Sequence, residues 1–130
     1  MLHVPDPHSR EQSESLLERT IARANGAVAM YAVRLRADGE TAGFAGYAPR
    51  QLDWGDELEL GWMLLPAFHG RGYATEAAAA LRTVVPGRVV SLIRVENDAS
   101  RNVAQKIGMT LEREIEFAGF QTHVFASERP

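Results

Sequence analysis

Hydrophobic residues recur with two different periods along this chain. Segments in which apolar and polar positions alternate, or which are short and wholly apolar, predict β-strands, and recurrence every three or four residues predicts helices. The predicted strands are residues 27–36, 41–47, 57–65, 88–95, 111–117 and 122–127. The predicted helices are residues 10–24, 73–85 and 97–108, and residues 49–55 are a predicted loop.

The first of these helices rests on a short amphipathic segment. Leu16, Leu17, Ile21 and Ala24 fall at helical spacing, and Ser9 begins a capping-box pattern ahead of them. An Asn-Gly pair follows directly and ends the pattern. We therefore expect an amphipathic helix before the first strand.

The composition is that of one small domain, residues 1–130. Its net charge is −3, from 14 basic and 17 acidic residues. The chain has no stripe of basic residues, which argues against a nucleic-acid-binding surface. With no cysteine, the chain forms no disulfide and has no thiolate nucleophile. His3, His8 and His123 lack metal-ligand spacing, so we predict no bound metal. No apolar run has the length of a signal or membrane-spanning segment, and we expect a cytoplasmic protein without a membrane partner.

A glycine-rich turn between the strand at 57–65 and the following helix carries the strongest chemical signal. Gly70 and Gly72 remove side chains where the backbone approaches a ligand, and the first turn of the helix has N–H groups without partners inside it. These donors and the helix dipole favour a phosphate or pyrophosphate. A nucleotide-hydrolase loop would require Lys-Ser or Lys-Thr after the last glycine, where Tyr73 and Ala74 stand instead. A dinucleotide fold would require a third spaced glycine.

The stretch from His69 to Ala74 resembles the pyrophosphate-binding turn of the GNAT superfamily of N-acetyltransferases, although His69 stands where Gln or Arg is usual. Residues 73–77 look most like the subgroup that acetylates the N-terminal amines of ribosomal proteins. A second motif follows in the order typical of the family: a strand, Asn97, a helix of about ten residues and a Lys-x-Gly ending at Gly108.

The resemblance implies a GNAT fold, an α/β (α+β) domain whose mixed, mostly antiparallel sheet carries helices on both faces. It also implies acetyl-coenzyme A (acetyl-CoA) as co-substrate, with the pantetheine arm held by a strand that splays from its neighbour. The residues expected to bind it are Trp62, Met63, Leu64, His69, Gly70, Arg71, Gly72, Tyr73, Ala74, Asn97 and Ser100. For the first three, only the backbone is expected to take part, and their side chains are ordinary core residues.

Acetyl transfer to a primary amine, a protein N-terminus or a small molecule, requires a group that accepts the proton of the amine. Glu59 is the candidate base or water-positioning residue, and Glu57, on the same strand face, is the second candidate. Two carboxylates about 7 Å apart on one strand face would raise each other's pKa and attract a cationic amine. The alternative is that both glutamates belong to a solvated face.

The family's thiolate-protonating tyrosine lies seven residues after its asparagine, and here that position is Ala104. Ser100 is the candidate substitute, a hydrogen-bond donor to the sulfur atom. Asn97 fits both a ligand of the pantetheine amides and a plain helix N-cap. Arg71 fits both a phosphate contact and a solvent-exposed side chain.

Family members begin with a further strand and helix, so the resemblance implies a domain shortened at its N-terminus. The absent strand would lie beside residues 27–36 and leave an unpaired edge there. We expect dimerisation, coverage of this edge by the N-terminal tail, or poor solubility. Two other functions stay open: a non-catalytic acyl-CoA-binding sensor or scaffold, and a fragment that needs a partner chain to complete its sheet.

Overall fold

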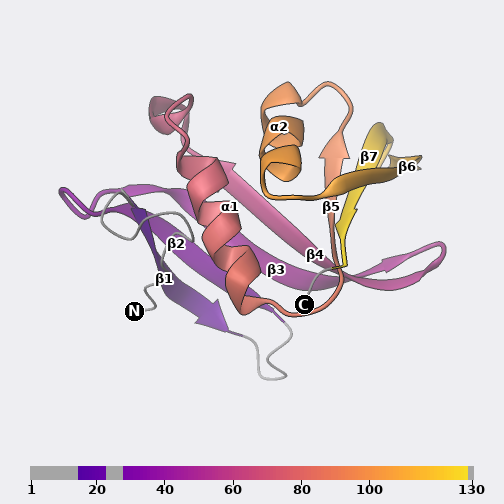
Figure 1. Cartoon of the computed structure of the whole chain (residues 1–130), viewed down its shortest axis with the longest axis horizontal. Helices are drawn as coiled ribbons and strands as arrows, with labels where there is room; N and C mark the ends of the chain where they lie inside the picture. The colour runs from indigo at the N-terminus through magenta and orange to yellow at the C-terminus, as the bar shows by residue number, and fades with distance from the viewer. Residues whose placement is uncertain (1–14, 23–27, 129–130) are drawn as a thin grey trace.

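One seven-stranded mixed sheet organises the protein in a computed structural model that describes residues 15–22 and 28–128. The strands follow the order β1-β2-β3-β4-β5-β7-β6, and each neighbouring pair is antiparallel except β4 and β5 (Figure 1). The strands are β1 (Ser15–Ala22), β2 (Ala29–Leu35), β3 (Thr41–Leu52), β4 (Gly55–Leu64), β5 (Val89–Arg94), β6 (Thr110–Phe117) and β7 (Phe120–Ser127). The helices are the 3-10 turn η1 (Pro66–Phe68), α1 (Tyr73–Val84) and α2 (Asp98–Lys106).

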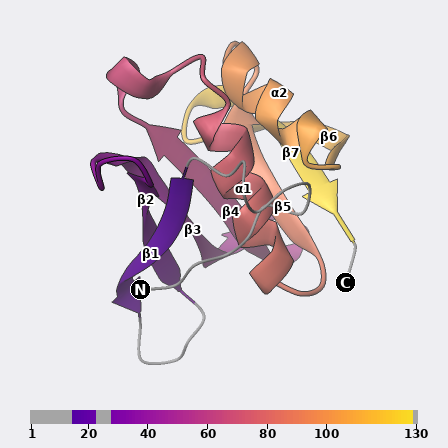
Figure 2. The same cartoon turned by 60° about the vertical axis from the view of Figure 1, so that its left-hand side comes forward.

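Both α-helices lie on one face of the sheet, where α1 crosses β3 and β4 and packs beside α2 (Figures 1 and 2). The core forms between them and the sheet because Leu60, Leu81, Ala104 and Phe125 meet there, each almost fully buried. The helix that the resemblance implies on the other face is not among the described residues. None of the described helices is long and apolar enough to cross a membrane.

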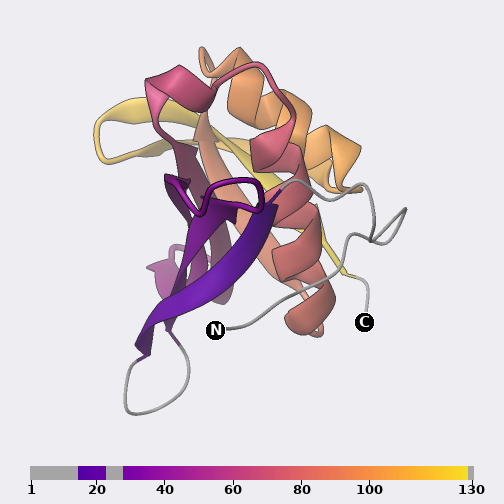
Figure 3. The ribbon, with the colours of Figure 1, turned by 90° about the vertical axis from the view of Figure 1, so that its left-hand side faces the viewer.

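The segment before β2 forms a strand where the sequence predicts a helix. Residues 15–22 are β1 and pair antiparallel with β2 over the register Ser15↔Leu35 to Ala22↔Ala29 (Figure 3). A short apolar run is ambiguous between helix and strand, and here pairing with the backbone of β2 decides. The edge of β2 that we expected to be open is therefore covered by the N-terminal part of the chain. The predicted capping box and both ends of the predicted helix lie outside the described residues.

The predicted loop at residues 49–55 is also wrong, because β3 continues to Leu52. Pro49 pairs with Leu58 in the extended β3–β4 hairpin. The pairing of β3 with β2 ends at Tyr47, so Pro49, which has no N–H, lies where β3 faces no neighbour on that side. The other predicted strands and the two later helices are confirmed, with shifts of a few residues at their ends.

The sheet divides between β4 and β5, the one parallel pair among the described strands. Glu59↔Val90 is the one register pair that joins these two strands in the described chain, whereas β3 and β4 pair continuously from Gly55 to Leu64. The two strands diverge beyond this pair. The divergence that the resemblance predicts for this strand is therefore present.

Candidate cofactor groove and active site

The divergence leaves backbone groups of β4 without a strand partner. The buried Ser91 of β5 donates its hydroxyl to the carbonyl oxygen of Leu60 at 2.7 Å, which shows that Leu60 directs its backbone toward β5. Successive residues of a strand direct their backbone groups to opposite edges, so Trp62 also faces the opening and Met63 faces β3. Among the three residues predicted to hold pantetheine by their backbone, Trp62 and Leu64 thus turn their backbone toward β5. Their side chains pack against the core as expected, but the expectation of a core side chain is wrong for Met63, which is 61% exposed.

A cavity of about 310 Å³ occupies this opening. Glu59 lines it at the point where the two strands are still paired, and Trp62 lines it further along β4. Asn97 and Ser100, from the start of α2, close its other side. We call this cavity the split.

A larger groove of about 510 Å³ continues from the split, with which it shares Trp62, Asn97 and Ser100. It runs between the start of α1 and the start of α2. All the residues predicted to bind the cofactor line it, except Arg71. Its full lining is Trp62, Met63, Leu64, Phe68, His69, Gly70, Gly72, Tyr73, Ala74, Thr75, Asn97, Ala99, Ser100, Asn102, Val103 and Lys106.

The glycine turn has the geometry of an anion site. Gly70 and Gly72 adopt left-handed φ values of 78° and 81°, and a Cβ at either position would meet no atom within 4 Å. The first backbone bond of α1 runs from the N–H of Glu76 to the carbonyl of Gly72 at 3.0 Å. The N–H groups of Tyr73 and Ala74 precede this bond, have no partner within the helix and lie at the groove.

His69, at the start of the glycine turn, contacts the backbone of the loop that precedes it. A ring nitrogen of His69, Nε2, lies 2.9 Å from the carbonyl oxygen of Leu64, the last residue of β4. This contact joins the two ends of the loop that carries η1. Arg71 is exposed and is not among the residues that line the groove, so its contact with a phosphate stays a prediction.

Asn97 is the N-cap of α2, as one of its two predicted roles requires. Its Oδ1 accepts a hydrogen bond from the backbone N–H of Ser100 at 3.1 Å. This bond leaves the amide nitrogen of Asn97, at the rim of the groove, without a described partner. The hydroxyl of Ser100 also has no described partner and lies where the groove meets the split. Ala104 stands at the family's tyrosine position and is fully buried in the core. Alanine has no proton to donate, so this position supplies no acid.

Glu59 is the carboxylate at the inner end of the split. Arg50 of β3 pairs with it, and both guanidinium contacts, at 2.5 and 2.9 Å, go to Oε1. No described residue donates to Oε2. Glu59 is therefore held in place through one oxygen, while the other is available to a ligand.

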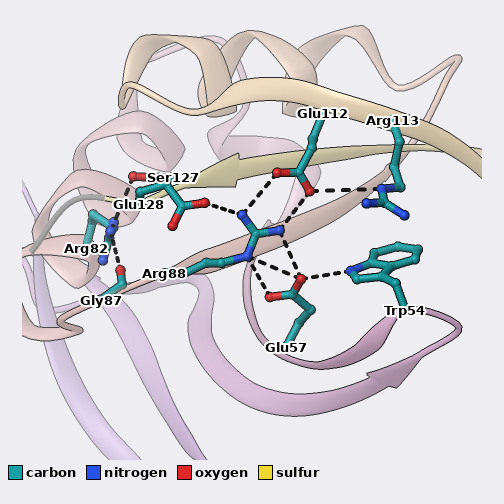
Figure 4. Close-up of polar contacts among 9 residues, drawn as sticks. All are labelled: Trp54, Glu57, Arg82, Gly87, Arg88, Glu112, Arg113, Ser127 and Glu128. Atoms are coloured by element: carbon teal, nitrogen blue, oxygen red, sulfur yellow. Dashed lines mark hydrogen bonds and ion pairs between the residues drawn. The ribbon is translucent and has the colours of Figure 1, made fainter.

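Glu57 is not placed to act as a second base, since it lines neither the split nor the groove. It accepts hydrogen bonds from Arg88 at 2.9 Å and from Trp54 at 2.8 Å, and its side chain is only 8% exposed (Figure 4). These bonds, above all those from Arg88, hold the pKa of Glu57 below its ordinary value. The expectation that two neighbouring glutamates would raise each other's pKa is therefore wrong for Glu57.

Arg88, directly before β5, joins β4, β6 and the segment after β7 near the paired end of β4 and β5. Besides Glu57 it contacts Glu112 of β6, at 2.7 Å, and Glu128 after β7 (Figure 4). The same guanidinium lowers the pKa of Glu112. We call these four residues the Arg88 cluster, and it fixes the end of the sheet from which the split opens.

Sequence reasoning missed three polar or aromatic residues of the groove, Phe68, Thr75 and Lys106, and placed Asn102 near the cofactor path only as a weaker candidate. Phe68 and Thr75 flank the glycine turn, and Asn102 and Lys106 lie on the exposed side of α2. Asn102 and Lys106 are four residues apart, so a helix starting at Asn97 places them on one face. Lys106 belongs to the Lys-x-Gly motif, which could have marked it as a phosphate contact.

Comparison with known proteins identifies the family. The family model described as "Acetyltransferase (GNAT) domain" matches residues 1–110. The uncharacterized protein YkkB of Bacillus subtilis is 33% identical to this chain over 93 residues, which are 68% of this chain and 54% of YkkB. The chain belongs to the GNAT acetyltransferase family.

Solved structures show the same fold. The acetyltransferase of Agrobacterium tumefaciens strain C58 has a TM-score of 0.66 and 33% identity, covering 78% of this chain and 61% of that one. RimL, a ribosomal L7/L12 alpha-N-protein acetyltransferase solved in complex with coenzyme A, has a TM-score of 0.69 and 26% identity, covering 81% and 64%. The likeness to RimL supports the subgroup suggested by residues 73–77. This chain spans about half the length of YkkB and under two thirds of these two structures.

Proposed function

We propose that this protein transfers an acetyl group from acetyl-CoA directly to a primary amine. The observation that carries the proposal is the continuity of the cofactor groove with the split, which ends at Glu59. The groove runs from the glycine turn, whose N–H groups suit a phosphate, to the split, which ends at a carboxylate. Such a passage suits a reaction in which a bound thioester meets an amine at its far end.

The residues present fit acetyl-CoA along the whole groove. The glycine turn and the N-terminus of α1 would hold the pyrophosphate through backbone N–H groups. Lys106, at the other side of the groove, adds a cation for the phosphates. The backbone of Trp62 and the free amide nitrogen of Asn97 would bond the pantetheine arm, because both lie where groove and split meet.

Acetyl-CoA supplies an activated acetyl group, and the residues of the chain orient the two reactants and move the proton. The N–H of Trp62 faces the split and would stabilise negative charge that develops on the carbonyl oxygen. Glu59 Oε2 would accept the proton of the amine, directly or through water. As the new N–C bond forms and the C–S bond breaks, Ser100 donates a hydrogen bond to the departing sulfur atom. No covalent enzyme intermediate is required once both substrates are held in line.

The cofactor site is tested by calorimetry with acetyl-CoA on the wild type, on Gly72→Glu and on Gly87→Glu. Both glycines have a φ of 81° with open space around the Cβ position, so the two variants carry the same backbone strain. Only Gly72 lies at the groove. We expect binding by the wild type and Gly87→Glu and its loss in Gly72→Glu. Equal binding by all three would refute the placement of the cofactor.

A measurement of acetyl transfer distinguishes the proposed enzyme from the alternative, a non-catalytic acyl-CoA-binding module. The absence of an acid at Ala104 is the observation that keeps this alternative open. Release of free thiol that depends on an added amine supports the transferase. Cofactor binding without thiol release over a broad amine panel supports the sensor or scaffold.

The acceptor and the assembly state belong to the proposal as well. Likeness to RimL favours a protein N-terminus, and a small-molecule amine is the other candidate. The homodimer was predicted from an open edge on β2, and β1 covers that edge. Sedimentation at two protein concentrations tests it.

A further inference from the structure

His69 places a ring that can change its charge beside the predicted phosphate site. It directly precedes Gly70 at the start of the glycine turn, lines the groove and is exposed. Its Nε2 lies 2.9 Å from the carbonyl oxygen of Leu64. Because a carbonyl oxygen only accepts hydrogen bonds, Nε2 carries a hydrogen, and Nδ1 is the nitrogen that gains or loses a proton. No described residue forms a hydrogen bond with Nδ1.

The bond to Leu64 is compatible with both charge states of the ring. Nε2–H donates in this neutral tautomer and in the imidazolium alike. Protonation at Nδ1 therefore adds a positive charge and a second donor, while the ring still ties the glycine turn to the end of β4. The charge at the groove can change without a change in the geometry of the turn.

The other groups around the groove do not titrate near neutral pH. Lys106 of α2 and Tyr73 of α1 line it, and ordinary lysine and tyrosine side chains titrate near pH 10. Residues 62–64 of β4 bring no ionisable side chain, and no acidic residue belongs to the lining in the described part of the chain. Arg71 in the turn and Glu76 in the first turn of α1 are not among the lining residues. Imidazole is the side chain that ordinarily changes its charge between about pH 5 and 8.

We propose that His69 couples cofactor binding to a proton: its imidazole takes up a proton from solvent when the phosphates of acetyl-CoA occupy the glycine turn. This inference rests on the cofactor placement in the proposed function. A nearby negative charge favours the protonated form of a titrating cation, and the pyrophosphate brings such charge to the turn that follows His69. The same residue thus holds the turn through Nε2 and meets the charge of the ligand through Nδ1.

The sign of the linkage follows from this placement. A group that is more fully protonated in the complex makes binding take up protons, so the affinity rises as the pH falls through the range in which imidazole titrates. A tenfold preference of the phosphates for the protonated ring would make the cofactor bind about fivefold more tightly at pH 6 than at pH 8. About half a proton would be taken up at pH 7.

Calorimetry of the full chain between pH 6 and 8 tests this. The ligands are acetyl-CoA and dephospho-coenzyme A, because the phosphate monoester of coenzyme A itself titrates near pH 6 and the dephospho form lacks it. Each titration is run in two buffers with different heats of ionisation, which reports the protons taken up on binding. We expect both ligands to show the rise in affinity and the proton uptake at pH 7.

Two variants separate the charge of His69 from its bond to Leu64. Gln in His69→Gln has an amide N–H that can donate to the same carbonyl but carries no charge, and Arg in His69→Arg carries a fixed charge. We expect His69→Gln to bind about as the wild type does at pH 8, and His69→Arg about as the wild type does at pH 6, both without proton uptake. His123→Gln, on β7 and outside the groove, is the control and should keep the wild-type uptake.

Nuclear magnetic resonance gives the charge of the ring directly. The chemical shifts of the His69 ring, followed through a pH titration, should report protonation at higher pH with coenzyme A bound than without it. Wild-type binding with one affinity at every pH and no proton uptake would overturn this inference and leave the cofactor site standing. Wild-type pH dependence in His69→Gln would also overturn it, because another group would then take the proton. If the wild type binds neither ligand at any pH, the cofactor placement fails together with this inference.

Discussion

Glu59 of β4 and Val90 of β5 form the one register pair that holds these two strands together in the described chain. The candidate base therefore stands at the point from which the split opens. Glu59 lies where β4 is paired with both β3 and β5, and Trp62, further along β4, lines a space that a ligand can enter. Glu59 is thus held by strand pairing and is also open to a ligand in the split.

Replacing Glu59 by Gln removes the proton acceptor and also the charge that pairs with Arg50, and it should lower kcat about 100-fold while the affinity for acetyl-CoA stays unchanged. Steady-state thiol release and calorimetry measure the two quantities. Arg50→Met is the matched control, since it removes the cation but keeps the carboxylate. Equal losses of kcat in both variants would show that the ion pair matters and the base does not.

Removing the hydroxyl of Ser91 should destabilise the fold by about 1–3 kcal/mol, because the carbonyl of Leu60 loses its donor in a buried position. Urea unfolding of Ser91→Ala measures this. Ser100→Ala is the comparison: its hydroxyl is half-buried without a described partner, so its free energy of unfolding should stay within about 0.5 kcal/mol. A Ser91→Ala protein as stable as the wild type would contradict the role given to this bond.

The Arg88 cluster should make stability depend on acid pH. The pKa values of Glu57 and Glu112 are lowered in the folded state by hydrogen bonds from Arg88. A lowered folded pKa stabilises above the unfolded pKa, and this contribution is lost as pH falls through the folded value. The free energy of unfolding should therefore be level above about pH 5 and fall below about pH 4.

Glu57→Gln should reduce that dependence and cost about 1–3 kcal/mol at neutral pH. Urea unfolding at several pH values measures both effects. Glu40→Gln, exposed in the β2–β3 turn, is the control and should follow the wild-type curve. An unaltered pH dependence in Glu57→Gln would show that other groups cause the acid loss.

Gly46 of β3 and Gly61 of β4 are register partners, but replacing each by alanine should change the free energy of unfolding by different amounts. Gly46→Ala places a Cβ against the backbone of Ala29 and should lose about 2–4 kcal/mol or fail to fold. Gly61→Ala has open space and should change the free energy of unfolding by less than about 1 kcal/mol. Thermal unfolding of both variants checks this, and equal losses would contradict the packing described for the sheet.

The residues that local sequence signals predicted for the cofactor end lie together in the structure, and their role in binding stays a prediction. The glycine turn, the start of α1 and the Asn97 cap each depend on residues within one turn of chain, and the structure brings them to one groove. The secondary-structure predictions that were wrong concern segments whose conformation depends on pairing with a strand elsewhere in the chain. Residues 15–22 have a helical pattern but pair with β2, and Pro49 lies in a strand because β2 has already ended beside it.

The sequence by itself determined the family, the order of the later strands and helices, and the backbone donors of the glycine turn, because these follow from local periodicity and short motifs. Only the tertiary structure decided which glutamate lines the split. Arg88 lies 31 residues from Glu57 and removes it from the site, while Arg50 holds Glu59 by one oxygen. Such pairings depend on strand register and on where β4 and β5 separate, and local patterning does not specify either.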